Sequence, residues 1–388
     1  MNIVHITFAG AYTEGMTYQE VMLSNENLAA GHQVTVIASC YEYNKGKIVI
    51  VPPLDILLPS GKRIIRLPYK RIINRFVSEK LRKVTDLYDI LDEIKPDVVF
   101  YHDIEGYELL TVSRYKRNNP NTALYVDTHS DEYNSARNLF SKIILHKMIY
   151  HSFFMRSYKF FDKIFYISED TKKFLIKTHK FKETYMLEFY PLGGKMISVE
   201  AKKHIRNRIR DELKLSNDEL LFVHSGKINE LKRTLEILFN LEKLSSNKIK
   251  LVIIGTIEQD YMKKLSQYIH SQSVLFLGWK DSQDLLDYIS AADLYLQPGS
   301  QSAVMQNALC VGTPVLLFNY ISHKVYDKGN VFLIDDYSQM YHIFRMILNN
   351  PTLLSKMSEK AFKFSRTYLD YKLLAERITF PMNCRSKE

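Results

Sequence analysis

The sequence has few cysteines. Cys40, Cys310 and Cys384 lie far apart in a chain of 388 residues. This spacing gives neither the disulfide framework of a small secreted protein nor the paired cysteines of a zinc site. We therefore expect a protein of a reducing, cytoplasmic compartment that binds no metal ion.

Long apolar runs are also missing. No uninterrupted apolar stretch reaches the roughly 18–20 residues that a membrane-spanning helix needs. The first segment, NIVHITF, has the pattern of a strand and not that of a signal peptide. The sequence thus predicts a protein that stays inside the cell.

Acidic residues are outnumbered by basic ones, 43 to 53, which gives a net charge of +10. Such an excess suits nucleic acid, anionic lipid or phosphorylated substrates. No RNA-binding fingerprint, zinc spacing or basic zipper is present, so nucleic acid is not a predicted partner. Residues 62–83 hold nine Lys or Arg residues and a single acidic residue, Glu79.

The chain is too long for one ordinary core, and its length predicts two domains. In both halves, apolar strand segments alternate with helical segments, which indicates α/β domains with parallel sheets and right-handed crossovers. The turn FYPLGGK and the charged run after it mark a boundary. We place the domains at residues 1–198 and 199–366 and a final helix within residues 367–388.

Polar side chains follow two predicted strands of the first half. PDVVFYHD ends in His102 and Asp103, and ALYVDTHSDEY carries Asp127, His129 and Asp131. Ligands of open α/β sheets gather at the carboxyl ends of the strands. A single histidine there is more often structural, but histidines on two successive strand ends favour a site.

Two features of the second half suit an anion. SGKINELKRTLEIL places Gly226, Lys227 and Lys232 beside the start of a helix. PGSQSAVMQNALCVGTP places Gln301, Ser302 and Ala303 at the start of another, where backbone N–H groups lack partners. The alternatives are a solvated helix start and an ordinary βαβ unit without a ligand.

The order of these motifs resembles glycosyltransferase family 4, from residue 2 to about residue 378. ALCVGTPVLL is similar to the segment that follows the second glutamate of that family's Glu-seven-residues-Glu motif. In this frame the first glutamate falls on Gly299 and the second on Asn307, so both carboxylates are missing. The resemblance implies a GT-B fold, in which two Rossmann-like domains face each other across a cleft and the final helix crosses back to the first domain.

The resemblance also implies roles for single residues. Lys227 and Lys232 follow the family's Gly-Arg-(four residues)-Lys motif, with lysine in place of arginine, and would hold the donor diphosphate. His129 would touch the sugar or the acceptor. On the donor side the implied residues are Gly15, Gly226, Gly278, Gln301, Ser302, Ala303 and Asn307. On the acceptor side they are His102 and Asp131.

The implied activity is retaining transfer of a hexosyl group from a nucleotide-sugar to a hydroxyl of a glycan or lipid-linked sugar, without a cofactor, in bacterial capsule or O-antigen assembly. The missing glutamates motivate an alternative, a non-catalytic GT-B partner of a glycosyltransferase. A GT-B epimerase fits the motif order less well. Basic helices in residues 62–83 and 141–161 are expected to lie on an anionic membrane surface, although a solvated basic surface would have the same composition.

Overall fold

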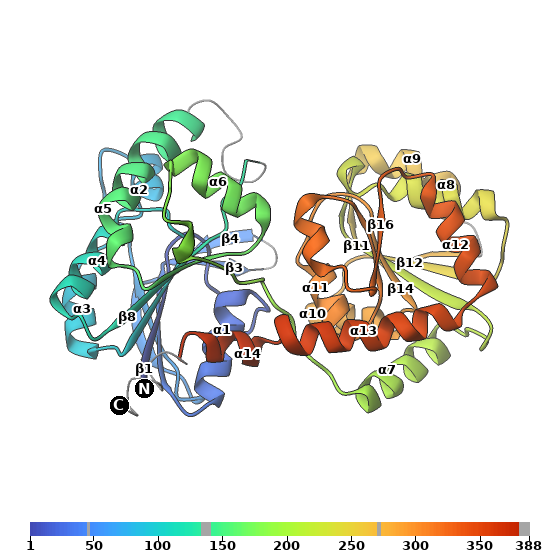
Figure 1. Ribbon diagram of the computed structural model, residues 1–388, viewed down its shortest axis with the longest axis horizontal. Helices are drawn as coiled ribbons and strands as arrows, with labels where there is room; N and C mark the ends of the chain where they lie inside the picture. The colour runs from blue at the N-terminus through green and yellow to red at the C-terminus, as the bar shows by residue number, and fades with distance from the viewer. Residues whose placement is uncertain (45–46, 133–140, 270–272, 380–388) are drawn as a thin grey trace. The chain divides into compact units, whose positions relative to one another are not determined.

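The computed structural model describes residues 1–388 except 45–46, 133–140, 270–272 and 380–388 (Figure 1). The chain forms two compact units. Unit 1 comprises Met1–Pro191 and returns at Tyr371–Glu388, and unit 2 comprises Leu192–Asp370. Both are α/β units with a central parallel sheet, which confirms the predicted fold class.

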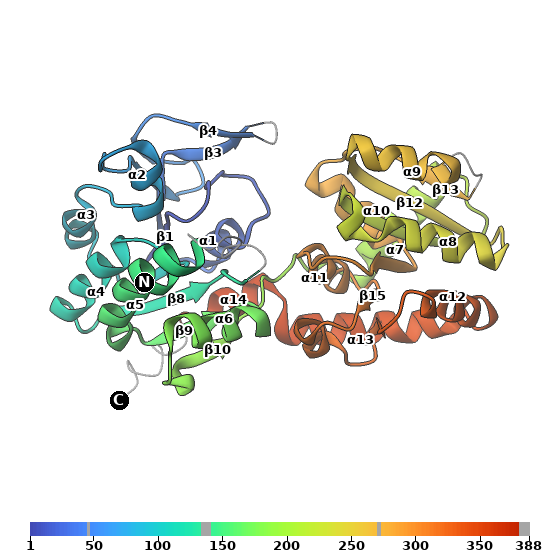
Figure 2. The same ribbon diagram turned by 90° about the horizontal axis from the view of Figure 1, so that it is seen from above.

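Unit 1 contains a sheet of eight strands in the order β10-β9-β8-β7-β1-β2-β6-β5, of which only the edge strand β5 is antiparallel, and a separate hairpin, β3–β4 (Figure 2). Its strands are β1 (Asn2–Thr7), β2 (Gln33–Ser39), β3 (Tyr41–Asn44), β4 (Lys47–Ile50), β5 (Leu54–Leu57), β6 (Arg63–Leu67), β7 (Val98–His102), β8 (Ala123–Thr128), β9 (Lys163–Tyr166) and β10 (Leu187–Phe189). Its helices are α1 (Gln19–Ala29), α2 (Arg75–Leu81), α3 (Leu87–Ile94), α4 (Glu108–Asn118), the π-helix η1 (Ser141–Tyr150), α5 (His151–Ser157), α6 (Glu169–His179) and α14 (Tyr371–Arg377), with 3₁₀ turns η2 (Tyr158–Phe160) and η3 (Thr184–Met186).

The two faces of this sheet bury different residues because side chains alternate along a strand. In β7, Val99 and Tyr101 pack with residues of α3–α6, whereas Val98 and Phe100 pack with residues of α1 and α14. The second face is covered by helices from the two ends of the chain, since α14 packs on α1 (Figure 2).

Unit 2 has six parallel strands in the order β13-β12-β11-β14-β15-β16. These strands are β11 (Leu220–Ile228), β12 (Ile249–Ile257), β13 (Val274–Phe276), β14 (Leu294–Gln297), β15 (Val315–Phe318) and β16 (Val331–Ile334). The helices are α7 (Val199–Glu212), α8 (Thr234–Leu244), α9 (Gln259–Ile269), α10 (Ser282–Ala291), α11 (Val304–Cys310), α12 (Gln339–Asn349) and α13 (Thr352–Tyr368), with 3₁₀ turns η4 (Glu230–Lys232) and η5 (Ile321–Tyr326).

The prediction of a basic amphipathic helix in residues 62–83 is wrong. This segment contains strand β6 and the short helix α2. Lys62, directly before β6, is fully buried and forms an ion pair with Glu14 at 2.8 Å. Arg66 is also buried and donates to backbone carbonyls of Ser39 and Tyr12.

The second predicted basic helix, in residues 141–161, is the π-helix η1 followed by α5 and η2. Phe154, expected on its apolar membrane face, is fully buried in the core. The side chains of Lys142 and Ile143 lie outside the described residues. No helix in the described part of the chain is long and apolar enough to cross a membrane.

Candidate functional site

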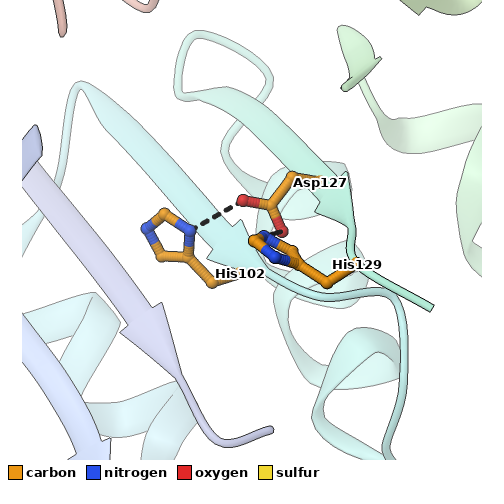
Figure 3. A group of neighbouring side chains, drawn as sticks. All are labelled: His102, Asp127 and His129. Carbon is orange, nitrogen blue, oxygen red and sulfur yellow. Dashed lines mark hydrogen bonds and ion pairs between the residues drawn. The ribbon is translucent and has the colours of Figure 1, made fainter. Parts of the chain in front are cut away.

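The carboxyl ends of β7 and β8 bring three predicted residues of unit 1 together (Figure 3). His102 is the last residue of β7, Asp127 lies near the end of β8, and His129 follows β8. The Nδ1 of His102 lies 2.8 Å from Oδ2 of Asp127, and the Nε2 of His129 lies 3.3 Å from Oδ1. Asp127 is therefore held between two imidazole rings.

The charges in this group depend on one another. Burial alone would raise the pKa of Asp127, but the two histidines hold that pKa well below its usual range. Burial alone would lower the pKa of His129, but Asp127 raises that pKa to about 9. At neutral pH the group thus contains an ionised carboxylate and a protonated His129, whose side chain is 32% exposed.

Asp103, in the loop after β7, also contacts Asp127. Its backbone N–H donates to Oδ1 of Asp127 at 2.6 Å, and its φ of 72° lies in the left-handed region that non-glycine residues seldom adopt. Burial, together with nearby Glu105, raises the pKa of the Asp103 carboxyl to about 7. Asp131 lies two residues beyond His129 and is half-buried.

Sequence reasoning missed two members of this group, His5 and Asn27. His5 is fully buried in β1, with Nδ1 at 3.1 Å from Nε2 of His102 and Nε2 at 3.0 Å from Oδ1 of Asn27. Within the apolar segment NIVHITF, a histidine gives no sign of a site. The one available signal is the alternation of side chains along the strand, which places His5 on the same sheet face as His102 and Asp127.

Among the described residues, His102, Asp127 and His129 form the single group of three potential metal-ligand side chains, with ligand atoms within 4.8 Å of one another. Both nitrogens of His102 are already in hydrogen bonds, and both oxygens of Asp127 accept from N–H donors. Hydrogen bonding accounts for this arrangement, and we assign no metal ligands here.

In unit 2, Lys232 lies over Gly226. Gly226 has a φ of 132°, and a Cβ built there would lie 2.9 Å from Cε of Lys232. Gly255, paired with Gly226 in the neighbouring strand, has no room for a side chain, because a Cβ there would lie 1.8 Å from the carbonyl oxygen of Gly226. Burial lowers the pKa of Lys232, and this ammonium group forms no ion pair with any described residue.

Lys227 has different surroundings. Lys227 follows Gly226 in β11, so its side chain points to the face of the sheet opposite to that of position 226. Its side chain is 72% exposed, and its Nζ lies 3.3 Å from Glu258. Of the two predicted lysines, Lys232 is the one that is partly buried beside the glycine pair.

The loop after β14 is fixed against η4. The amide of Ser300 donates to the carbonyl of Leu231 at 2.8 Å, and a Cβ built on Gly299 would lie 2.1 Å from that same oxygen. The position of the family's first glutamate therefore has no space for any side chain. Gln301, Ser302 and Ala303 follow this contact and lead into α11.

The position of the second glutamate packs on another backbone segment. Oδ1 of Asn307 lies 2.9 Å from a Cβ built on Gly194, and Gln306 accepts a hydrogen bond from the amide of Gly193 at 2.9 Å. Helix α11 thus rests closely on the two glycines, and Asn307 is half-buried there.

The remaining predicted glycines lie in loops with positive φ, 83° for Gly15 and 69° for Gly278. Gly278 also accepts a hydrogen bond from the amide of Gly255 at 2.8 Å. Trp279, the single tryptophan, is 71% exposed beside Gly278. Both glycines suit turns in which the backbone adopts a positive φ.

Residues 205–364 match the model of a family described as glycosyl transferases group 1. None of the curated proteins matches the chain. Among solved structures, HepE from Anabaena in complex with UDP is similar, with a TM-score of 0.70 and 12% identity, over 99% of this chain and 100% of its own.

Two further structures show the same likeness. Sucrose-phosphate synthase from Thermosynechococcus elongatus has a TM-score of 0.69 at 14% identity, over the full length of both chains. WaaG, a glycosyltransferase of lipopolysaccharide biosynthesis, has a TM-score of 0.62 at 15% identity, over 97% of this chain and 99% of its own. The chain has the GT-B fold of these glycosyltransferases, and most of its unit 2 is similar to the group 1 family.

Proposed function

We propose that the protein transfers a hexosyl group from a nucleotide-sugar to a hydroxyl acceptor with retention of configuration. The observation that carries the proposal is Lys232, a partly buried ammonium group without an ion-pair partner among the described residues, inside the segment that matches the group 1 family. A buried cation is costly unless something compensates its charge. A diphosphate is an anion of suitable charge, and HepE of the same fold binds UDP.

In the proposed reaction, the bond between the anomeric carbon and the diphosphate breaks, and the diphosphate leaves with the electron pair. Lys232 stabilises the negative charge that grows on the leaving group, helped by the amides of Gln301, Ser302 and Ala303. Lys227 meets the outer phosphate from the solvent side, and Asn307 faces the ribose. The acceptor hydroxyl bonds to the anomeric carbon and gives its proton to the leaving phosphate.

Protonated His129 is the residue of unit 1 to which the proposal gives a role. Asp127 raises the pKa of His129 to about 9, so the imidazole is charged at neutral pH, and in the proposal this charged ring contacts a hydroxyl of the sugar or acceptor. The proposal places His102 and Asp131, which lie in the same unit as His129, on the acceptor side. No protein nucleophile is needed in this scheme.

A panel of nucleotide-sugars tests the proposal, with donor hydrolysis and thermal stabilisation as readouts. We expect one donor class to stabilise the protein and to be turned over slowly without acceptor. Stabilisation without turnover, with any acceptor, would instead support a non-catalytic partner of a glycosyltransferase. That alternative is favoured by the lack of a carboxylate at both Gly299 and Asn307.

We further propose that the acceptor is a glycan or lipid-linked sugar of bacterial surface-polysaccharide assembly and that the protein lies at the inner face of the cell membrane. Lys70, Arg71 and Arg75 are exposed beside Ile73 and Phe76, whose exposed fractions are 85% and 55%. Cations around exposed apolar side chains suit an anionic bilayer. WaaG, of the same fold, acts in lipopolysaccharide biosynthesis.

A further inference from the structure

The hydrogen bonds around Asp127 continue away from His129 into the interior of unit 1. His102 Nε2 lies 3.1 Å from His5 Nδ1, and His5 Nε2 lies 3.0 Å from Asn27 Oδ1. The Nδ2 of Asn27 donates to the carbonyl of Ala375 in α14 at 3.2 Å. These hydrogen bonds form one line that begins in α14, passes through α1, β1 and β7, and ends at Asp127 in β8.

The direction of these hydrogen bonds follows from the one between Asn27 and Ala375. Because the carbonyl of Ala375 can only accept, the amide of Asn27 presents its oxygen to His5. His5 must then carry its proton on Nε2. Burial lowers the pKa of His5 to about 3, so its other nitrogen is unprotonated and accepts.

This fixes two protons on His102. Its Nε2–H donates to His5 and its Nδ1–H donates to Asp127, since a carboxylate can only accept. A neutral His102 would leave two acceptors facing each other somewhere along the line. In this arrangement the His102 ring carries one positive charge. His102 is 6% exposed and lies next to the carboxylate of Asp127, which orients His129.

We propose that His5 and Asn27 are positioning residues that, through His102 and Asp127, set the orientation and the proton affinity of His129. The proposal rests on the proposed function in one respect, the contact of His129 with a sugar substrate. The effect is electrostatic, because the positive charge on His102 offsets part of the negative charge of Asp127. Without that offset, Asp127 would hold the proton of His129 more tightly.

Other described charged groups act on the two ends of this line. Those that act on His5 are His102, Lys62 and Asp127. Among the described residues, Asp127, Asp103 and Glu20 act on the pKa of His129. Lys62 is held by its ion pair with Glu14, and Asp103 lies beside Arg82 at 3.9 Å. The charge on His102 is the one that substitution of His5 changes directly.

The test compares two substitutions at one position in the full chain. His5→Leu removes the acceptor for His102, so His102 loses its second proton. His5→Asn places an amide oxygen near the position of Nδ1 and keeps the acceptor. The readout is the pKa of His129 by NMR titration of histidine-labelled protein, with its signal assigned by its absence in His129→Gln.

We expect the pKa of His129 to rise by about one pH unit in His5→Leu, the scale of one nearby charge at an effective dielectric near 20. It should stay near the wild-type value in His5→Asn. Should His5→Leu fail to fold, Asn27→Leu serves in its place, because it releases the tautomer of His5 and predicts the same rise. An unchanged pKa in a folded His5→Leu or Asn27→Leu protein would overturn the proposal.

The same variants separate this inference from the proposed function. The titration needs no substrate, so it decides the charge on His102 even if no donor is found. Where turnover is measurable, the alkaline fall in kcat should move up by about one pH unit in His5→Leu, and the nucleotide affinity of unit 2 should stay unchanged. Stoichiometric Zn²⁺ binding to the wild-type protein that Asp127→Asn abolishes would also overturn the proposal, since the metal would replace the protons.

Discussion

A lysine that is partly buried without a carboxylate carries a cost in stability. Lys232 is in this position, since burial lowers its pKa and no described residue forms an ion pair with it. Lys62 shows the contrasting case, because it is more deeply buried but paired with Glu14. A cation with a shifted pKa and no ion-pair partner among the described residues is a candidate functional group.

We predict that Lys232→Met lowers turnover by a factor that corresponds to about 2–4 kcal/mol of transition-state stabilisation. The same substitution should leave the stability of unit 2 unchanged or raise it, because it removes a desolvated charge. Steady-state kinetics and denaturant unfolding check both. Lys227→Met is the matched control and should have the smaller effect on turnover, since Lys227 is 72% exposed and paired with Glu258. Equal losses in both variants would contradict the ranking.

His129 gives a prediction with a pH dependence. Its folded-state pKa of about 9 lies above its ordinary 6.5. The pair with Asp127 therefore adds stability that is complete below about pH 6.5 and is lost as the pH rises through 9. We expect kcat to fall over that same alkaline range, because the imidazolium loses the proton that it donates.

Replacement of His129 by Ala should lower kcat by about 10–100-fold, the loss of one charge-assisted hydrogen bond. Nucleotide affinity should change little, because the proposed phosphate contacts lie in unit 2. His129→Gln keeps an N–H donor for Asp127 and separates loss of charge from loss of shape. If nucleotide binding collapses while kcat survives, His129 has another role.

At the level of elements, the turn after β14 explains the missing first glutamate. Its backbone is hydrogen-bonded to η4, and Gly299 lies against the carbonyl of Leu231. This contact brings the residues before α11 close to the turn that carries Lys232. A side chain at position 299 would separate the two segments.

We therefore predict that Gly299→Ala lowers the melting temperature of the protein and weakens nucleotide binding. A Cβ at 2.1 Å from an oxygen forces the loop to move. Gly10→Ala is the control, since a Cβ there meets nothing within 4 Å. Gly299→Glu should behave like Gly299→Ala and gain no donor affinity. A rise in donor affinity in Gly299→Glu would show that the loop accepts the side chain after all.

The elements that sequence alone predicted well are those whose signal is local. The apolar runs before His102 and His129 specify buried parallel strands, and the ends of such strands meet at one edge. The sequence could not show that His5 joins them. Its partner His102 is 97 residues away, and their contact depends on strand order and parity.

The same limit explains the error in residues 62–83. Nine cations among apolar residues predict a basic helix. In the structure, Lys62 and Arg66 are satisfied by Glu14 and by backbone carbonyls of distant residues. Burial of charge in a strand is thus decided by tertiary partners, which the local pattern does not contain.

For the whole molecule, the question is where the net charge of +10 lies. Lys62, Arg66 and Arg82 are engaged inside unit 1, with Arg82 at 3.2 Å from Glu105. Lys70, Arg71 and Arg75 remain exposed. We assign a membrane contact through this segment to these three cations, of which Arg75 is paired with Glu79 at 2.7 Å, and to Ile73 and Phe76, and we define the five residues together as the basic tip.

Ile73 makes the basic tip unusual. It is 85% exposed, and its φ of 55° lies in a region that β-branched residues rarely adopt. Exposed apolar side chains that are ringed by cations can enter the interface of an anionic bilayer while the cations meet lipid headgroups. Each cation contributes about 1 kcal/mol at most near such a surface.

We predict that the protein co-sediments with anionic liposomes and much less with neutral ones. Reversal of Lys70, Arg71 and Arg75 to Glu should reduce binding by roughly 100-fold, because up to about 3 kcal/mol of attraction is lost. Ile73→Ser with Phe76→Ser should weaken binding at high salt, where the apolar term dominates. Reversal of the exposed Arg345, Lys356 and Lys363 in unit 2 is the matched control, since it changes the net charge equally. Equal loss in that control would assign the attraction to overall charge, and equal binding to neutral liposomes would exclude the electrostatic mechanism.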